Sequence, residues 1–231
     1  LEFRRVLFRS MSCMLSHNIG TLSATTAFGK TVFAIAMIAK RKVNTLILVH
    51  RKSLLDQWKT HLENFLEINE VVVNDGKKRM SKKQQSPIGT LYSGKNSIHG
   101  IIDIALIQSC FDGNEVSAFV ENYGMVIVDE CHHVSSVSFE QVLRRVKAKY
   151  VYGLTATPIR KDGHQPIIFM QCGKIRFTAD AQSQMNNQSF SRILIPRFTT
   201  FRNISSDDKT YTRVVETISK DEVRNRLIID D

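Results

Sequence analysis

The sequence has 231 residues, of which 42% are hydrophobic and 23% are charged, so it can bury the core of one domain. No uninterrupted apolar run approaches the roughly 18 residues that a membrane-spanning helix requires, which excludes a membrane span. Lys and Arg outnumber Asp and Glu by 32 to 22, and the net charge of +10 suits a polyanionic partner such as nucleic acid.

The first ten residues, LEFRRVLFRS, differ in character from those that follow. They place three Arg and one Glu among Leu, Phe and Val, and they lack the long apolar region and the cleavage signal of a secretory leader. We interpret residues 1–10 as a non-native tail, with a short native amphipathic segment as the alternative. Without its three positive charges and one negative charge, the net charge falls from +10 to +8, so the basic balance remains.

Short apolar runs rich in β-branched residues alternate with helical patterns along the rest of the chain. This alternation is typical of βαβ units that build a parallel sheet with helices on both faces, and it predicts an α/β fold. The predicted strands are Gly20–Ser23, Thr45–Val49, Val71–Val73, Ile102–Ile107, Met125–Val128, Tyr150–Leu154 and Ile167–Met170.

Three helices are predicted between these strands. Lys30–Ala39 is apolar on nearly all sides, as in a helix buried against a sheet. A second helix is predicted where Ser53 and Asp56 fit a capping box. In this helix, apolar residues recur at helical spacing at Leu54, Trp58, Leu62 and Phe65. A third helix is expected at Ser138–Val146.

Two segments are predicted to be loops. Residues 74–87 combine an Asp-Gly turn with a basic run, which we interpret as a solvated loop, with a nucleic-acid contact as the alternative. Residues 180–191 are rich in Gln, Asn and Ser, and we interpret them as a linker or insertion. A helical stretch is expected near the end of the sequence, over Asp207–Ile229.

A phosphate-binding loop is predicted between the first strand and the first helix. There, backbone N–H groups and the helix N-terminus would cradle phosphates, Lys30 would neutralise the β and γ phosphates, and the Thr31 hydroxyl would ligate Mg²⁺. A chance Gly-Lys-Thr at a helix start is the alternative, because an Ala opens the motif and a bulky Phe interrupts it. The predicted loop consists of Ala24, Thr25, Thr26, Ala27, Phe28, Gly29, Lys30 and Thr31.

Two carboxylates follow the apolar strand Met125–Val128. Asp129 would hold Mg²⁺ at the end of the strand, and Glu130 could polarise the water that attacks the γ-phosphate. Paired acids of this kind also occur as plain strand-end caps. The order of the two elements along the chain favours a nucleotide-hydrolysing site.

Polar side chains adjacent to these carboxylates are expected to relay the state of the nucleotide. His132 and His133 would bridge the ATP site to neighbouring groups, and Thr155 and Thr157 could hydrogen-bond the segment that begins at Asp129. A simple strand-ending turn is the alternative for the Thr-Ala-Thr-Pro segment.

The four cysteines are scattered without a Cys-x-x-Cys pair, which favours a reducing cytoplasm. Cys131 precedes the two histidines, but three adjacent side chains on an extended segment cannot all face one ion, so a zinc site is not favoured.

Taken together, these segments resemble superfamily 2 helicases and translocases in order, spacing and residue type. The segment Gly153–Phe169 is most similar to XPB-type repair helicases and to the helicase subunits of restriction enzymes. The resemblance covers about residues 14–201. Its motifs are I at Ala24–Thr31, Ia at Leu46–Trp58, Ib at Ile102–Ser109, II at Asp129–His132 and III at Thr155–Thr157.

The resemblance implies a RecA-like domain that uses ATP and Mg²⁺, with Lys30, Asp129 and Glu130 as catalytic residues. It also implies that Arg51 and Ser109 contact the phosphodiester backbone of a nucleic acid, DNA rather than RNA. The carboxyl ends of parallel strands, where both residues are expected, are the usual ligand-binding edge of open α/β sheets. A solvated charge at Arg51 and a helix N-cap at Ser109 are the alternatives.

The resemblance implies a domain organisation as well. Residues 11–201 would form the ATP-binding domain, and residues 202–231 would lead toward a second RecA-like domain whose motifs, including an arginine finger, are not found here. We therefore expect a fragment. A small-molecule P-loop kinase and a non-catalytic nucleic-acid-binding remnant remain as alternatives, which nucleic-acid-stimulated turnover and Mg·ATP binding would separate.

Overall fold

The computed structural model describes residues 2–25, 28–69, 86–132, 137–156, 165–179, 196–200 and 211–230. The chain divides into two compact units, Leu1–Asn187 and Gln188–Asp231. The predicted strand Val71–Val73 and most of the two predicted loops lie outside the described residues.

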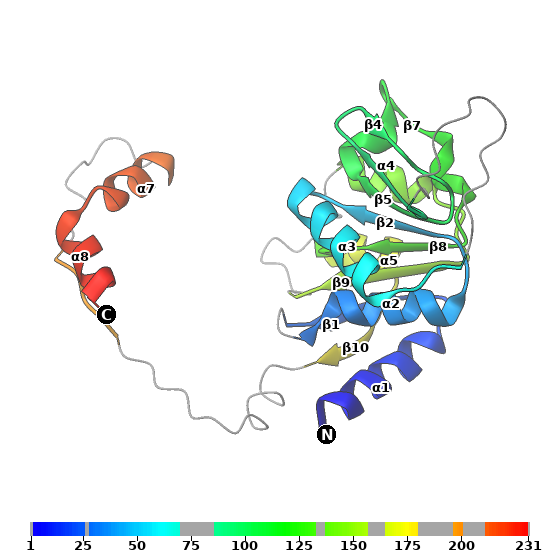
Figure 1. The fold of residues 1–231 in the computed structure, drawn as a ribbon, viewed down its shortest axis with the longest axis horizontal. Coiled ribbons are helices and arrows are strands. Elements are labelled where there is room, and N and C mark those ends of the chain that lie inside the picture. Colours follow the sequence, from blue (N-terminus) through cyan, green and yellow to red (C-terminus); the bar gives the residue numbers. More distant parts are fainter. Residues whose placement is uncertain are drawn as a thin grey trace. The chain divides into compact units, whose positions relative to one another are not determined.

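The first unit contains an eight-stranded sheet in the order β10-β1-β9-β8-β2-β5-β3-β4 (Figure 1). Its neighbouring strands are parallel, except for the antiparallel pair β3 and β4. The strands β6 (Phe111–Asp112) and β7 (Glu115–Val116) form a separate antiparallel sheet of two strands. The strands of the large sheet are β1 (Ile19–Ala24), β2 (Thr45–Val49), β3 (Ile88–Tyr92), β4 (Lys95–Asn96), β5 (Ile102–Leu106), β8 (Met125–Val128), β9 (Tyr150–Thr155) and β10 (Ile175–Ala179).

Helices connect these strands. In the part of the chain that the structure describes, none is long and apolar enough to cross a membrane. The helices of the first unit are α1 (Glu2–Leu15), α2 (Lys30–Arg41), α3 (Lys52–Phe65), α4 (Val137–Arg145) and α5 (Gln165–Cys172), with short 3-10 helices η2 (Ile107–Cys110) and η3 (Ala118–Asn122).

The sheet separates two apolar cores because successive side chains of a strand point to opposite faces. In β2, Ile47 and Val49 enter the core shared with α1, α2 and α3, whereas Leu46 and Leu48 enter the core shared with η2, η3, α4 and α5. All four side chains are completely buried, and each contributes about 1.5–3 kcal/mol of burial free energy. The predicted α/β fold with helices on both faces is confirmed.

The parallel register brings the carboxyl ends of the central strands to one edge. Val49 of β2 is paired with Leu106 of β5, and Val128 of β8 is paired with Gly153 of β9. The loops that follow β1, β2, β5, β8 and β9 therefore leave the sheet on the same side, which places the predicted motifs along one edge.

The predicted strand Ile167–Met170 is wrong. These residues lie inside α5, and the strand at this edge of the sheet is β10, which begins three residues after α5 ends. A short apolar run has the same composition in a buried helix and in a buried strand, so its pattern does not decide between them.

The predicted capping box is also wrong. Ser53 is the second residue of α3, whose N-cap is Arg51, and no side-chain hydrogen bond caps this helix. Leu55, Trp58 and Leu62 form the buried face of α3, whereas Phe65 at its end is 59% exposed.

Residues 2–10 belong to α1, and several side chains from Val6 onward take part in the packing of the first unit. Val6 and Leu7 pack against the core, and Ser10 is completely buried, with its hydroxyl donating to the Leu7 carbonyl (2.8 Å). Further along α1, the Cys13 thiol donates to the Arg176 carbonyl of β10 (3.0 Å). The non-native origin of residues 1–10 stays a prediction.

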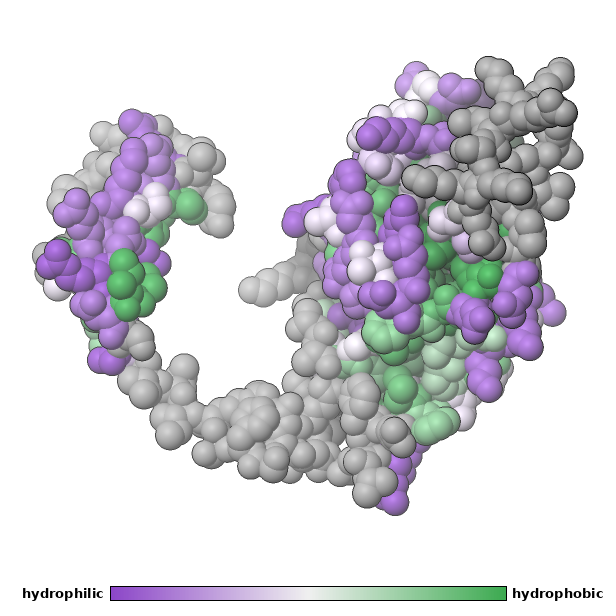
Figure 2. Space-filling view, in the orientation of Figure 1, coloured by the Kyte–Doolittle hydropathy of each residue, from purple (hydrophilic) through white to green (hydrophobic). Residues whose placement is uncertain are grey.

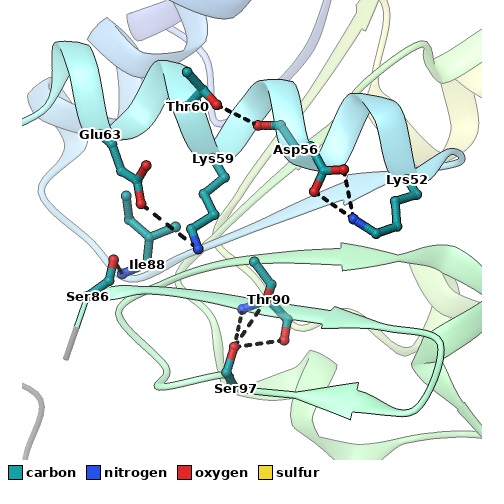
Figure 3. A network of polar contacts seen from close by, with 9 residues as sticks. All are labelled: Lys52, Asp56, Lys59, Thr60, Glu63, Ser86, Ile88, Thr90 and Ser97. Atoms are coloured by element: carbon teal, nitrogen blue, oxygen red, sulfur yellow. Dashed lines mark hydrogen bonds and ion pairs between the residues drawn. The ribbon is translucent and has the colours of Figure 1, made fainter.

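The outward face of α3 is hydrophilic (Figure 2). Lys52 pairs with Asp56 at 2.7 Å and Lys59 lies 4.0 Å from Glu63, both across one helical turn above the β3–β4 hairpin (Figure 3). Exposed pairs at this spacing contribute only about 0.3–0.5 kcal/mol each, so they stabilise α3 slightly and do not determine where it packs.

The second unit contains α7 (Tyr211–Ser219) and α8 (Glu222–Asp230). Within the described residues, the helical stretch expected over Asp207–Ile229 thus consists of two helices. Asp221 lies at the break, where its carboxylate accepts a hydrogen bond from the backbone N–H of Arg224 (2.7 Å) and caps α8.

Candidate functional site

The loop after β1 turns directly into α2. Gly29 is the N-cap of α2 and adopts a left-handed conformation, with φ 77° and ψ 41°. A residue with a Cβ would cost about 1–2 kcal/mol in this conformation. Among the described residues other than the chain neighbours of Gly29 and the backbone of α2, no atom lies within 4 Å of the position that a Cβ would occupy there, so these residues leave space beside the loop.

Phe28 faces the core. Its side chain is completely buried, and its ring lies 6.5 Å from the ring of Phe33 on α2. The bulky residue that departs from the usual motif therefore packs inside the domain. Thr31 is the second residue of α2 and is half-buried, while Thr26 and Ala27 lie outside the described residues.

Lys30 connects the loop to the end of β8. Its side chain is only 8% exposed, and its Nζ donates to the Ala24 carbonyl at 3.1 Å. The same Nζ lies 4.0 Å from Glu130 Oε1. A buried cation thus stands between β1 and the acidic segment.

Asp129 is held through both carboxylate oxygens. The indole N–H of Trp58 donates to Oδ2 at 2.8 Å, and the backbone N–H of Glu130 donates to Oδ1 at 2.9 Å. Burial raises the pKa of Asp129 above its ordinary value, and the hydrogen bond from Trp58 opposes this shift because it stabilises the carboxylate.

Glu130 has a left-handed backbone, with φ 48°. A non-glycine residue in this region carries strain of about 1–3 kcal/mol, and such strain is often found at functional sites. Its Oε1 faces Lys30, and its Oε2 lies 3.2 Å from His132 Nδ1.

His132 brings the acidic segment and β9 together. Its Nδ1 lies 3.2 Å from the hydroxyl of Thr155, a completely buried residue at the end of β9. The predicted partners His132 and Thr155 are thus within hydrogen-bonding distance, whereas His133 and Thr157 lie outside the described residues.

Arg51 and Ser109 follow neighbouring strands at the same edge. Arg51 is exposed at the N-cap of α3, two residues after β2. Ser109 lies within η2, and its hydroxyl accepts a hydrogen bond from the Ser93 N–H at 3.2 Å. The N-cap of η2 is Leu106, so the N-cap alternative for Ser109 is wrong.

Trp58 is the residue of the site that sequence reasoning missed. Helical spacing identified it only as part of an apolar face. Its chemistry could have indicated a polar contact, because a buried indole N–H usually finds a hydrogen-bond partner. Trp58 is the single tryptophan of the chain.

The family match and the relatives, together with the fold, identify the first unit as a RecA-like domain of the superfamily 2 helicase type, with Lys30, Asp129 and Glu130 grouped at the carboxyl edge of its sheet. The chain belongs to the family described as type III restriction enzyme, res subunit, whose model matches residues 8–160. The predicted resemblance is confirmed.

Relatives of the chain carry helicase or translocase names. The chain is 33% identical over 168 residues to "Putative helicase 109L" of Invertebrate iridescent virus 3, covering 71% of this chain and 47% of that protein. It is 26% identical over 175 residues to "DNA 3'-5' translocase XPB2" of Sulfurisphaera tokodaii, covering 76% of this chain and 35% of that protein. The chain thus spans less than half the length of these relatives.

Solved structures support the fold. A hypothetical ATP-dependent RNA helicase from Sulfolobus tokodaii matches with a TM-score of 0.56 and 15% identity, over 75% of this chain and 52% of that chain. The UvsW helicase from bacteriophage T4 matches with a TM-score of 0.53 and 15% identity, over 76% of this chain and 58% of that chain.

Proposed function

We propose that the first unit binds Mg·ATP and contributes the hydrolytic residues of a nucleic-acid-dependent motor that acts on DNA. The main observation in support of this proposal is that Lys30, Asp129 and Glu130, from two separate segments, lie together at the carboxyl edge of the sheet. DNA is favoured over RNA by the name of the XPB2 relative, a DNA translocase, and by the XPB-like segment of the sequence.

The residues at the carboxyl edge of the sheet would have separate roles. Lys30 would hold the β and γ phosphates beside the open space at Gly29, and Glu130 would orient and deprotonate the attacking water. Thr31 and Asp129 supply oxygen atoms, which are the ligands that Mg²⁺ prefers, so the residues fit this ion. When bound, Mg²⁺ would neutralise charge on the phosphates.

His132 and Thr155 would carry the state of the nucleotide to the neighbouring strand. His132 Nδ1 is 3.2 Å from both Glu130 Oε2 and the Thr155 hydroxyl, so a change in the charge at Glu130 would act on the His132–Thr155 contact at the end of β9. His133 and Thr157 are proposed to extend this link.

Lys30→Ala is expected to remove most of the affinity for Mg·ATP. Loss of one partner from a buried charged contact costs about 2–5 kcal/mol, which corresponds to about a 30-fold to several thousand-fold weaker affinity. Titration with a fluorescent ATP analogue measures this change. Lys40→Ala is the matched control, because Lys40 is an exposed lysine of the same helix. Unchanged affinity in Lys30→Ala would show that the phosphate loop is misassigned.

Arg51 and Ser109 are proposed to contact the nucleic-acid backbone. They follow β2 and β5, which are neighbours in the sheet with Val49 paired to Leu106, so they lie along one edge. Phosphate contacts give affinity without base specificity.

Arg51→Ala is expected to weaken DNA binding equally for all sequences and to reduce the salt dependence of binding by about one phosphate contact, a slope change of about 0.9. Fluorescence anisotropy of labelled DNA between about 50 and 200 mM salt measures both effects. Arg144→Ala, which removes an exposed arginine of α4, should leave the slope unchanged. Tighter binding of RNA of the same sequence would argue against the choice of DNA.

A further inference from the structure

We propose that Trp58 is a positioning residue for the metal-holding carboxylate, and that its indole N–H sets the orientation in which Asp129 meets Mg²⁺. This inference rests on the proposed function, in which Asp129 is a Mg²⁺ ligand. It adds a residue from α3, a helix that supplies none of the phosphate-binding or hydrolytic residues.

The geometry fixes the plane of the carboxylate. Trp58 Nε1 donates to Oδ2 at 2.8 Å, and the Glu130 N–H donates to Oδ1 at 2.9 Å. Two donors on different oxygens, from two different segments, restrict rotation of the Asp129 side chain. Each carboxylate oxygen accepts more than one hydrogen bond or ligand, so both oxygens keep capacity for a cation or its water.

Indole chemistry suits this role. The indole N–H only donates, so it stabilises the carboxylate form and cannot itself compete for a metal ion. Trp58 is 1% exposed and Asp129 is 7% exposed, which shields their hydrogen bond from competing water. A hydrogen bond to a charged group in such a setting is stronger than one between neutral groups.

Helix α3 also connects the proposed metal site, through Trp58, to Arg51, the proposed nucleic-acid contact. Arg51 caps the N-terminus of α3, and Trp58 lies seven residues further, about 10 Å along the helix axis. The same end of the helix is tied to β3, because Lys52 Nζ lies 4.3 Å from the centre of the Tyr92 ring. A shift of this helix end would therefore move the donor that holds Asp129.

Packing alone is the competing explanation. Trp58 belongs to the core shared by α1, α2 and α3, and its ring would stabilise that core whatever its N–H contacted. The two explanations differ in Trp58→Phe, which keeps an aromatic ring in the core but removes the donor. A positioning role predicts specifically weaker Mg²⁺ binding, seen as a higher Mg²⁺ concentration at half-maximal nucleotide binding, whereas packing predicts only lower stability.

The test measures the Mg²⁺ concentration that gives half-maximal binding of a fluorescent ATP analogue to the full 231-residue chain. Trp58→Phe should raise this concentration about tenfold or more, with unchanged nucleotide binding in EDTA. Tyr152→Phe is the matched control, because it removes a buried aromatic hydroxyl that donates to the His17 carbonyl, two residues before β1, and it should leave the midpoint unchanged.

Each result of this titration decides a different point. An unchanged midpoint in Trp58→Phe, or an equal loss of binding in EDTA, overturns the positioning role. If the wild-type chain binds the nucleotide without any dependence on Mg²⁺, the proposed function fails, and the inference fails with it.

A second measurement does not depend on the folding of Trp58→Phe. The single tryptophan gives one indole ¹H–¹⁵N resonance, which should lie downfield and exchange slowly in the absence of nucleotide and Mg²⁺. Asp129→Asn should move it upfield, because the acceptor loses its charge. A resonance that does not respond to Asp129→Asn overturns the inference.

Discussion

Glu130→Gln is expected to leave Mg·ATP bound while slowing its hydrolysis about 10²- to 10⁴-fold in a protein that contains both motor domains. The amide has nearly the same shape as the carboxylate, but it cannot accept a proton from the attacking water. Lys30 and Asp129, which would hold the phosphates and the metal, remain unchanged. Single-turnover hydrolysis measures the rate, and titration with a fluorescent ATP analogue measures the affinity.

Glu121→Gln is a suitable control for this experiment. Glu121 is also a carboxylate in contact with basic side chains, Arg145 and Lys147, but it belongs to η3, away from the phosphate loop. Its replacement should leave hydrolysis unchanged. If Glu130→Gln and Lys30→Ala lose nucleotide affinity to the same extent, the two residues do not have the separate roles proposed here.

The order of motifs along the chain predicted much of the candidate site. Strands Thr45–Val49 and Met125–Val128 are confirmed with the same boundaries, because each contains four consecutive apolar residues that are followed by a polar residue. In a parallel sheet, the residues that follow such strands must meet at one edge, so the chemistry could be placed without knowledge of the strand order.

The strand order and the outer strands could not be predicted in this way. β10 reads Ile175–Ala179 with a charged and a polar residue among apolar ones, and β3 contains a glycine, so neither has a strong strand pattern. Their pairing with β1 and β5 is determined by contacts between residues far apart in the chain.

Details of the site depended on tertiary structure for the same reason. The spacing of α3 predicted a buried Trp58, but its hydrogen bond to Asp129 joins residues 71 positions apart. The left-handed backbone of Glu130 is rare for a residue of this type and leaves no trace in the sequence.

A polypeptide limited to these 231 residues is expected to bind Mg·ATP and to hydrolyse it at a barely detectable rate. In the family that the chain resembles, a second RecA-like domain supplies an arginine finger, which is worth about 10³–10⁵ in rate. Arg176 is poorly placed to replace it. Its Nε donates to the Ile19 carbonyl (3.3 Å) at the start of β1, about 17 Å along the strand from Ala24 at the phosphate loop.

Steady-state ATP hydrolysis by the 231-residue polypeptide, compared with that of a longer protein carrying a second RecA-like domain, tests this expectation. The longer protein should hydrolyse ATP about 10³- to 10⁵-fold faster, and its rate should depend on nucleic acid. Arg176→Ala in the longer protein is the control and should leave the rate unchanged, because its side chain contacts the start of β1, at the opposite end of that strand from the phosphate loop. Rapid, nucleic-acid-stimulated hydrolysis by the monomeric 231-residue polypeptide would contradict the need for a second domain, since the hydrolytic site would then be complete within this chain.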